Sequence, residues 1–324
     1  MADTNTTLRE APLRVAIIGG GISGLSTLLG ILHHCPRTRV IPHLYEAASK
    51  FSEIGAGVGF GPNAVRSMHV VDPALHASYQ RIAAKAPVVE RDGKKMVAWH
   101  YFIMGMDGRG VSGINDLKGL EEVPGATPYN HNTTHNVHRA AFLEEMLKLL
   151  RSKDQHDYVT FNKRLDDIVK CGDGLRLSFA DGSTDEVDAV IGADGVKSRV
   201  RKIVMGLQYE PRFTGKYTYR GLVPTQKVEE CIGHWANENI IITGYGGHIV
   251  GFPIDQGKTF NIVAFNTPKT KGRTWEHGEE WVVQSSSEAV LEDFAGWDHR
   301  VRRMLSMLDR PEKWGLFDVP QLPS

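Results

Sequence analysis

The sequence has few cysteines and no excess of charge of either sign. Its 324 residues include three cysteines, Cys35, Cys171 and Cys231, which are widely spaced and form no C-x-x-C pair. This pattern argues against a disulfide framework or a zinc site and indicates reduced thiols in a reducing, cytoplasmic compartment. Lysine plus arginine and aspartate plus glutamate each number 38, so the basic excess typical of nucleic-acid-binding proteins is missing.

Long hydrophobic runs are also scarce. One uncharged stretch, residues 15–32, has the length of a membrane span or a signal sequence. Five glycines interrupt it: Gly19, Gly20, Gly21, Gly24 and Gly30. We interpret its first part as a buried parallel strand and its second part as a helix, and expect neither a membrane segment nor a secretory signal.

Two local clusters of polar residues are given ordinary structural interpretations. Basic side chains gather in one place: Lys197, Arg199, Arg201 and Lys202. They fit a solvated helix face. Three histidines have helical spacing: His131, His135 and His138. They lie in an Asn- and Thr-rich stretch without clustered carboxylates or cysteines, so we expect a surface loop and no metal site.

Hydrophobic spacing predicts a β-α-β unit over the first 46 residues. Residues 14–18 form a short buried strand, and the leucines that follow the glycines recur at helical spacing: Leu25, Leu28, Leu29 and Leu32. Pro36 ends this helix. Residues 39–46 are interpreted as a second strand, in which Pro42 indicates a bulge or an early sheet edge.

The rest of the chain is predicted to contain further helices and strands. An amphipathic helix opens near Arg139, strands with a turn at 171–174 occupy residues 158–180, and a buried strand covers 187–191. Longer alternating strands over 214–267 are typical of an antiparallel sheet. Two short helices within 286–309 and a strand at 314–319 follow.

The first chemical motif is Gly19-x-Gly21-x-x-Gly24, placed between a strand and a helix. Gly19 permits a tight turn, Gly21 lets backbone N–H groups approach a pyrophosphate, and Gly24 allows close helix–strand packing. The helix N-terminus adds partial positive charge. Glu46 ends the next strand, where it can accept hydrogen bonds from an adenosine ribose, so the context predicts a dinucleotide site.

A second motif, Gly192-Ala193-Asp194-Gly195-x-x-Ser198, follows the strand at 187–191. An Asp-Gly pair at the end of a strand suits a cofactor crevice, although the same pair also forms plain turns. A glycine-dense segment, residues 55–63, includes Gly57 and Gly59 and ends in Pro62-Asn63. His138-Arg139 heads a helix, and Tyr219-Arg220-Gly221-Leu222 lies in the antiparallel region.

Together and in this order, these motifs resemble the single-component FAD-dependent aromatic monooxygenases, specifically the fungal salicylate-hydroxylase-like branch. The resemblance spans about residues 13–320. It implies an α/β protein with a Rossmann-like FAD-binding domain on a parallel sheet and a second domain on a largely antiparallel sheet. The implied boundaries are 13–86 and 131–207 for the FAD-binding domain, and 87–130 and 208–318 for the substrate domain, with tails at 1–12 and 319–324.

The resemblance also implies residue roles. Glu46 would bind the FAD ribose, Arg139 would lie near the pyrophosphate, and Gly57 and Gly59 would let the main chain pass close to the flavin ring. Asp194 and Gly195 match the motif that touches both FAD and the nicotinamide donor. Arg220 matches an arginine that faces the substrate and favours its phenolate, because a guanidinium stays charged. Ordinary alternatives are a salt-bridged sheet residue for Arg220 and a solvated helix-start residue for Arg139.

The implied reaction uses NADPH or NADH to reduce FAD. O2 then forms a flavin C4a-hydroperoxide that hydroxylates a phenolic or aromatic-acid substrate, a chemistry expected in secondary metabolism. Water must be excluded from such a site. Oxidative decarboxylation and dearomatisation are related outcomes of the same chemistry.

The sequence departs from the family pattern in two places. Many relatives have Tyr-Pro where this chain has Phe252-Pro253, so Tyr219 or Tyr245 is a candidate replacement for that hydroxyl. The family's third motif, a Gly-Asp-Ala-Ala-His stretch, does not occur in these residues. A shortened, catalytically impaired homologue that acts at most as a binding protein is therefore the alternative. A two-domain NAD(P)-linked dehydrogenase would explain the first fingerprint but not Arg139, Asp194 and Arg220 as a set.

Overall fold

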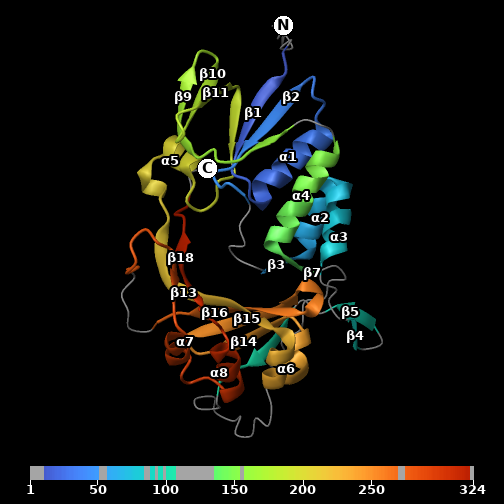
Figure 1. Cartoon of the computed structure of the whole chain (residues 1–324), viewed down its shortest axis with the longest axis vertical. Helices are drawn as coiled ribbons and strands as arrows, with labels where there is room; N and C mark the ends of the chain where they lie inside the picture. The colour runs from blue at the N-terminus through green and yellow to red at the C-terminus, as the bar shows by residue number, and fades with distance from the viewer. Residues whose placement is uncertain are drawn as a thin grey trace, which may run out of the picture.

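A computed structural model describes residues 11–50, 57–83, 88–91, 94–97, 100–106, 135–153, 157–268 and 274–321. Most of its strands and helices are arranged around two main sheets (Figure 1). A parallel sheet has the order β12-β1-β2-β8, and a seven-stranded, largely antiparallel sheet has the order β17-β18-β13-β16-β15-β14-β6. The α/β class and the pairing of a parallel with an antiparallel sheet are thus confirmed.

The parallel sheet lies between helices and a smaller sheet. Its strands are β1 (Leu13–Ile18), β2 (Val40–Tyr45), β8 (Val159–Thr160) and β12 (Ala189–Gly192). The helices on one side are α1 (Ile22–His34), α2 (Pro62–Val71), α3 (Pro73–Ile82) and α4 (Arg139–Lys153). On the other side lie β9 (Leu165–Cys171), β10 (Gly174–Phe179) and β11 (Thr184–Val187) (Figure 1).

Alternation along β1 explains these layers. Ile17 faces the helices and packs with Leu25 and Leu28 of α1, whereas Ala16 and Ile18 face β9–β11. All five side chains are buried, and burying each leucine or isoleucine contributes roughly 1.5–3 kcal/mol. The predicted β-α-β unit is therefore confirmed, with a helix that ends at His34, two residues before Pro36.

Among the described residues, helices cover one face of the seven-stranded sheet. Its strands are β6 (Tyr101–Met104), β13 (Arg212–Pro224), β14 (Ile240–Gly244), β15 (Gly247–Ile254), β16 (Thr259–Asn266), β17 (Val282–Gln284) and β18 (Glu312–Asp318). The helices beneath it in Figure 1 are α6 (Thr225–Ile232), α7 (Ser287–Asp293) and α8 (His299–Ser306). Side chains of the sheet and of these helices form one buried hydrophobic cluster.

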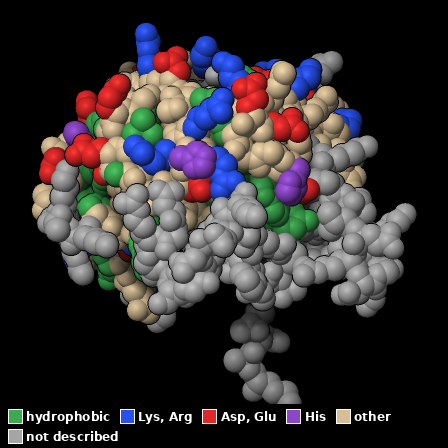
Figure 2. Space-filling view, turned by 90° about the horizontal axis from the view of Figure 1, so that it is seen from below, with side chains coloured by type: hydrophobic (Ala, Val, Ile, Leu, Met, Phe, Trp, Pro, Cys, Tyr) green, Lys and Arg blue, Asp and Glu red, His purple; other side chains and the backbone are tan. Residues whose placement is uncertain are grey.

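Beyond these helices lies solvent. Figure 2 views the molecule from that end, and its visible described residues carry charged side chains of both signs together with some hydrophobic ones. Short elements complete the fold: β3 (Gly57–Phe60), β4 (Val88–Arg91), β5 (Lys94–Val97), β7 (His135–His138), α5 (Arg199–Met205), and the 3-10 helices Leu207–Tyr209, Gly233–Asn237 and Asp255–Gly257. The domain boundaries themselves stay a prediction from the sequence.

Pro42 lies where β2 is paired on one side only. It is buried inside β2 and pairs with Val15 of β1, while the described pairs of β8 begin at Leu44, so the expected early edge is local to this residue. The N–H groups of Leu44 and Glu46 donate to the β8 side, to Tyr158 and Thr160, so the nitrogen of Pro42 has the same orientation. β8 is too short to reach it, so no hydrogen bond of the ladder is lost there, which is why proline is tolerated.

Two further segments differ from expectation. The strand expected at 187–191 is two strands, β11 and β12, because the chain changes sheets at Asp188, whose side chain accepts the Arg14 N–H. His135 and His138 lie in β7, which pairs with β3, and not in a loop, while His131 lies outside the described residues. Among the described residues, no three His, Cys, Asp or Glu side chains are grouped to hold a metal ion.

Two observations concern the cysteines and the expected absence of a membrane segment. Cys35, Cys171 and Cys231 are all free thiols. In the described part of the chain, no helix has both the length and the apolar character needed to cross a membrane.

Candidate cofactor and substrate site

The glycine turn between β1 and α1 packs against the segment that follows β12. Gly19 has φ +106°, and a Cβ there would lie 2.5 Å from the Ala193 carbonyl oxygen. A Cβ on Gly24 would lie 1.9 Å from the carbonyl oxygen of Gly19. Only glycine fits at either position, so the first motif and the Asp194 segment form one contiguous backbone surface at the carboxyl ends of neighbouring parallel strands.

The N-terminus of α1 is open at this surface. Gly21 is the N-cap residue and makes no side-chain cap, and a Cβ added to it would meet nothing within 4 Å. No acidic side chain lies in the first turn of α1. The first backbone N–H groups of the helix are therefore available to an anion such as a pyrophosphate.

Glu46 is fixed to the glycine turn. One of its carboxylate oxygens accepts the Gly20 N–H, and the other accepts the Ala48 N–H at 2.7 Å. Each oxygen can still accept a further bond, so the carboxylate remains suited to a ribose hydroxyl. Sequence reasoning found Glu46 but missed its second task, which is to hold the turn in place.

Asp194 organises the start of α5. Its Oδ1 accepts the Ser198 hydroxyl, and its Oδ2 accepts the Arg199 N–H at 2.7 Å and the Val200 N–H at 3.1 Å. Gly195 follows it, exposed and with no atom within 4 Å of an added Cβ. The Asp-Gly pair thus leaves an open approach beside the Gly19 turn.

Gly57 and Gly59 lie on β3, between the two sheets (Figure 1). A Cβ on Gly57 would lie 2.7 Å from the Phe252 ring of β15, and one on Gly59 would lie 2.8 Å from Asn136 Oδ1. Both glycines are therefore explained by packing within the protein, and their contact with a flavin stays a prediction. Asn136 in turn donates to Asn239 Oδ1 at 2.6 Å, a buried link to the strand β14 that the sequence did not signal.

Arg139 is the first residue of α4 and is half-buried. Its helix follows β7 directly, and β7 pairs with β3, so Arg139 stands at the end of the strand pair that carries Gly57. The helix start is confirmed at the expected residue. Its contact with the pyrophosphate stays a prediction.

Arg220 lies on the face of the seven-stranded sheet that is opposite the helices. Its neighbours Tyr219 and Gly221 point to the helix side, where Tyr219 is 1% exposed. The guanidinium lies 4.4 Å above the Trp314 ring, and Nε donates to Thr218 Oγ1 at 3.4 Å. Burial lowers the pKa of Arg220, while the charge of Glu312 raises it, and the side chain stays protonated.

Neither Tyr219 nor Tyr245 supplies a hydroxyl at the position of Phe252. The Tyr219 hydroxyl donates to Asp293 Oδ2 of α7 at 2.6 Å, on the helix side, and burial raises its pKa. Tyr245 is 60% exposed in the turn between β14 and β15. Phe252 faces Gly57 and the parallel-sheet half of the molecule, so this position of the face is apolar.

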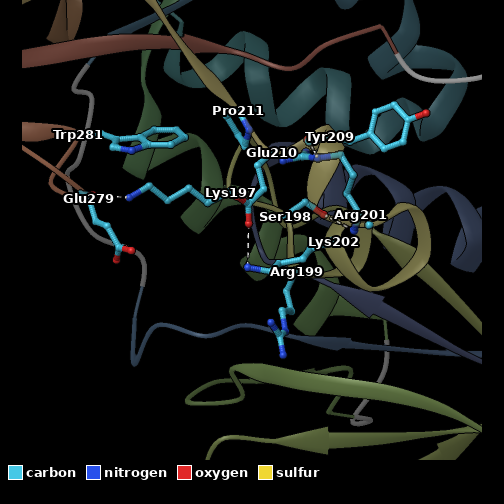
Figure 3. A pocket seen from close by; sticks show the side chains of 11 residues that line it. Lys197, Ser198, Arg199, Arg201, Lys202, Tyr209, Glu210, Pro211, Glu279 and Trp281 are labelled. Atoms are coloured by element: carbon cyan, nitrogen blue, oxygen red, sulfur yellow. Dashed lines mark hydrogen bonds and ion pairs between the residues drawn. The ribbon is translucent and has the colours of Figure 1, made fainter. Parts of the chain in front are cut away.

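A basic cavity of about 380 Å³ lies next to the second motif, because its lining residues Ser198 and Arg201 donate to Asp194 and to the Gly195 carbonyl. Its charged lining residues are Lys197, Arg199, Arg201, Lys202, Glu210 and Glu279. Arg199 and Lys202 of α5 are 42% and 41% exposed, so the expected solvated helix face also lines this cavity. In Figure 3, Lys197 extends toward Glu279 and Trp281, and Nζ donates to the Glu279 carbonyl at 3.0 Å and lies 4.4 Å from the Trp281 ring.

The other basic side chains of this cavity are bonded to the chain. Lys202 forms an ion pair with Glu210 at 2.8 Å. Arg201 donates to the carbonyl oxygens of Tyr209 and Val196, which holds the end of the second motif in place. Within the described residues Lys197 forms no ion pair, since its Nζ contacts the Glu279 carbonyl and the Trp281 ring.

Sequence comparison decides the family. The chain is 36% identical to the FAD-dependent monooxygenase pigN of Monascus ruber over 325 residues, which cover 98% of this chain and 69% of that protein. It is 34% identical to a salicylate hydroxylase of Pseudomonas putida over 338 residues, which cover 100% of this chain and 70% of that enzyme. The chain belongs to the FAD-dependent aromatic monooxygenases.

Further matches agree with this assignment. The 6-methylsalicylate 1-monooxygenase atA of Aspergillus terreus is 36% identical over 311 residues, which cover 94% of this chain and 64% of that enzyme. A solved salicylate hydroxylase–substrate complex has 29% identity and a TM-score of 0.74, covering 97% of this chain and 71% of that one. The chain spans about two thirds of the length of these relatives. No family model matches the sequence.

The monooxygenase family uses FAD, and the residues here fit that cofactor. The backbone cradle at Gly19, Gly21 and Gly24 excludes side chains where a dinucleotide approaches, and Glu46 is anchored beside it. The structure brings these residues together with Asp194 at one edge of the parallel sheet. FAD would be held there by helix N–H groups and by the Glu46 carboxylate.

Proposed function

We propose that this monooxygenase consumes NADH or NADPH and O2 to hydroxylate a phenolic or aromatic-acid substrate, in the cytoplasm and in secondary metabolism. The observation that carries the proposal is the position of Arg220. A half-buried cation stands on the sheet face that also carries Phe252, the ring packed against Gly57 of β3, and its register partner on β18 is Glu312. A flat anion bound there would lie between the substrate sheet and the dinucleotide half.

When bound, the flavin supplies the activation of O2 and the transfer of one oxygen atom. The chain's own residues bind and orient. Arg220 pairs with a carboxylate or phenolate oxygen, and its charge stabilises that anion in a poorly solvated place. The apolar side chains of the same face, including Val250 and Val263, exclude water from the ring.

The basic cavity beside Asp194 is the proposed docking site for the reductant. A pyridine dinucleotide carries two or three phosphates, and Lys197 presents a cation next to the Asp194–Gly195 approach. Trp281 offers an aromatic face in the same cavity. Lys197→Glu should raise the KM for NAD(P)H about tenfold or more, because it replaces an attraction for phosphate with a repulsion.

Lys170→Glu is the matched control for this substitution, since Lys170 is exposed on β9 and lies outside the cavity. It should leave the KM unchanged. Equal KM values for the two variants would show that NAD(P)H does not bind in this cavity. The FAD content of both variants is measured alongside, so that loss of cofactor is not mistaken for loss of reductant binding.

The function is tested by steady-state oxidation of NAD(P)H in the presence of a panel of hydroxybenzoates and larger phenols. We expect at least one phenol to stimulate oxidation and to yield an oxygenated product in near-stoichiometric amount, with little hydrogen peroxide. Oxidation that yields only peroxide with every phenol would contradict oxygenation, and a colourless protein that takes up no FAD would contradict the cofactor assignment.

A further inference from the structure

The face of the seven-stranded sheet opposite the helices carries a histidine, His248, besides the polar side chains of Thr218, Arg220 and Glu312. Thr218, Phe265 and His248 are register partners on β13, β16 and β15, so their side chains leave the sheet on one face. Arg220 is two residues beyond Thr218 on the same strand and therefore shares that face. Ile249, the neighbour of His248, points to the helix side and is fully buried.

The imidazole of His248 is held flat and half-buried. It stacks on the Phe265 ring with centroids 4.3 Å apart and an interplanar angle of 12°. Within the described residues, neither of its ring nitrogens has a hydrogen-bond partner. Burial, followed by the charge of Lys216, lowers the pKa of His248 from 6.5, so the ring is neutral at pH 7 and one nitrogen accepts a hydrogen bond.

Arg220 and His248 stand at opposite ends of an apolar strip. The Arg220 guanidinium lies over the Trp314 ring of β18 and Nε donates to Thr218, so it stands at the β18 end of the row Trp314, Thr218, Phe265 and His248. Thr218 and His248 are two strands apart, a separation of about 10 Å. The floor between them is formed by Phe265 and Val263, both half-buried. An aromatic ring with an anionic group on one side and a hydroxyl on the other has the shape and polarity of this strip.

We propose that His248 is a substrate-binding residue, whose imidazole accepts a hydrogen bond from a hydroxyl of an aromatic acid that pairs with Arg220. The inference rests on the proposed function, because it takes the open sheet face as the substrate surface. It adds to that function a contact that distinguishes substrates, because the His248 imidazole accepts a hydrogen bond that only a hydroxyl can donate. The site thereby selects hydroxylated aromatic acids over their methyl ethers.

The experiment measures dissociation constants by titration calorimetry on the FAD-loaded protein, with matched pairs of probes. The pairs are 3-hydroxybenzoate with 3-methoxybenzoate, and 4-hydroxybenzoate with 4-methoxybenzoate. We expect the wild type to bind the hydroxyl member of at least one pair about tenfold more tightly, the size expected when one hydrogen bond at a partly buried group is left unmade. His248→Phe keeps a ring to stack on Phe265 but cannot accept, so it should bind both members equally.

Two further variants separate recognition from structure. His248→Gln retains an acceptor and should keep part of the discrimination. His299→Gln is the matched control, because His299 lies on α8, on the helix side of the sheet, with a side chain that is 84% exposed. It should keep all of the discrimination. A merely structural role of His248 would change the melting temperature of its variants without changing the ratio of the two dissociation constants.

The outcomes distinguish this proposal from the one it rests on. If the wild type binds neither a hydroxybenzoate nor a larger phenol, the proposed function fails. If it binds only larger phenols without an acid group, the pairing of an aromatic acid with Arg220, and with it the role of His248, is overturned. If the wild type binds hydroxybenzoates without discriminating, or if His248→Phe discriminates as well as the wild type does, the function stands and the role of His248 is overturned.

Discussion

At the residue scale, two glycines of the same helix have opposite requirements. Gly24 is irreplaceable because a Cβ there would overlap the Gly19 carbonyl oxygen at 1.9 Å, whereas a Cβ on Gly30 would meet Val71 at an ordinary 3.7 Å. Gly24→Ala should lower the free energy of unfolding by about 3 kcal/mol or more and abolish FAD binding. Gly30→Ala should raise it by about 1 kcal/mol, since alanine is the better helix former.

Urea unfolding of the two variants and of the wild type checks this prediction. A Gly24→Ala protein as stable as the wild type would show that the close approach of α1 to the Gly19 turn is not required. The sequence motif predicted the importance of Gly24 correctly. It gave no indication that Ala193 packs against Gly19 on the other side of the turn, because that residue is distant in the chain.

Tyr219 and Arg220 are adjacent in sequence but serve opposite faces. Tyr219→Phe removes a hydrogen bond to Asp293 and should cost about 1–2 kcal/mol of stability with no change in substrate affinity. Arg220→Gln should leave stability nearly unchanged and weaken binding of an aromatic acid about tenfold or more, because a charge-assisted bond is lost. Melting temperatures and dissociation constants of both variants test the pair, and an affinity loss in Tyr219→Phe would contradict the division of faces.

At the scale of the element, strand register determined what sequence spacing alone left open. The alternation in residues 214–267 predicted an antiparallel sheet, and the structure confirms it. Which face carries the substrate depends on where α6, α7 and α8 pack, and that is set by contacts between distant segments. For the same reason Tyr219 was a plausible hydroxyl donor from the sequence, whereas His248 gave no signal until its register with Thr218 was known.

The segment that leads into β14 carries an acid with a strongly altered titration. Burial raises the pKa of Glu238 from 4.5 to about 7. The folded state therefore binds more protons than the unfolded state between these values, so stability contributed by the protonated form is present below pH 4.5 and is lost as pH rises to about 7.

Glu238→Gln should remove this dependence, because the amide does not titrate. Urea midpoints measured from below pH 5 to above pH 7 should decline for the wild type and stay flatter for the variant. A wild-type profile as flat as that of Glu238→Gln would contradict the raised pKa. A parallel decline in both proteins would assign the pH dependence to other groups.

At the scale of the whole molecule, the cofactor cradle lies on one sheet and the proposed substrate surface on the other, with β3 between them. The sequence was sufficient for the cradle, since its motifs are local and follow single strands. It was insufficient for the substrate face, for the cavity lined by Lys197, and for the placement of Pro42, because each depends on which segments become neighbours. The contacts of Arg139, Gly57 and Gly59 with FAD remain predictions at this scale.

The most direct test is an anaerobic titration of the FAD-loaded protein with hydroxybenzoates, followed by the visible absorbance of the flavin. Substrate bound at Arg220, between the sheet face and β3, should change the flavin spectrum in a saturable way. In Arg220→Gln the change should need about tenfold or more ligand, in keeping with the lost charge-assisted bond. A protein that holds FAD but whose flavin spectrum is unchanged by every hydroxybenzoate would contradict the placement of the substrate beside the cofactor.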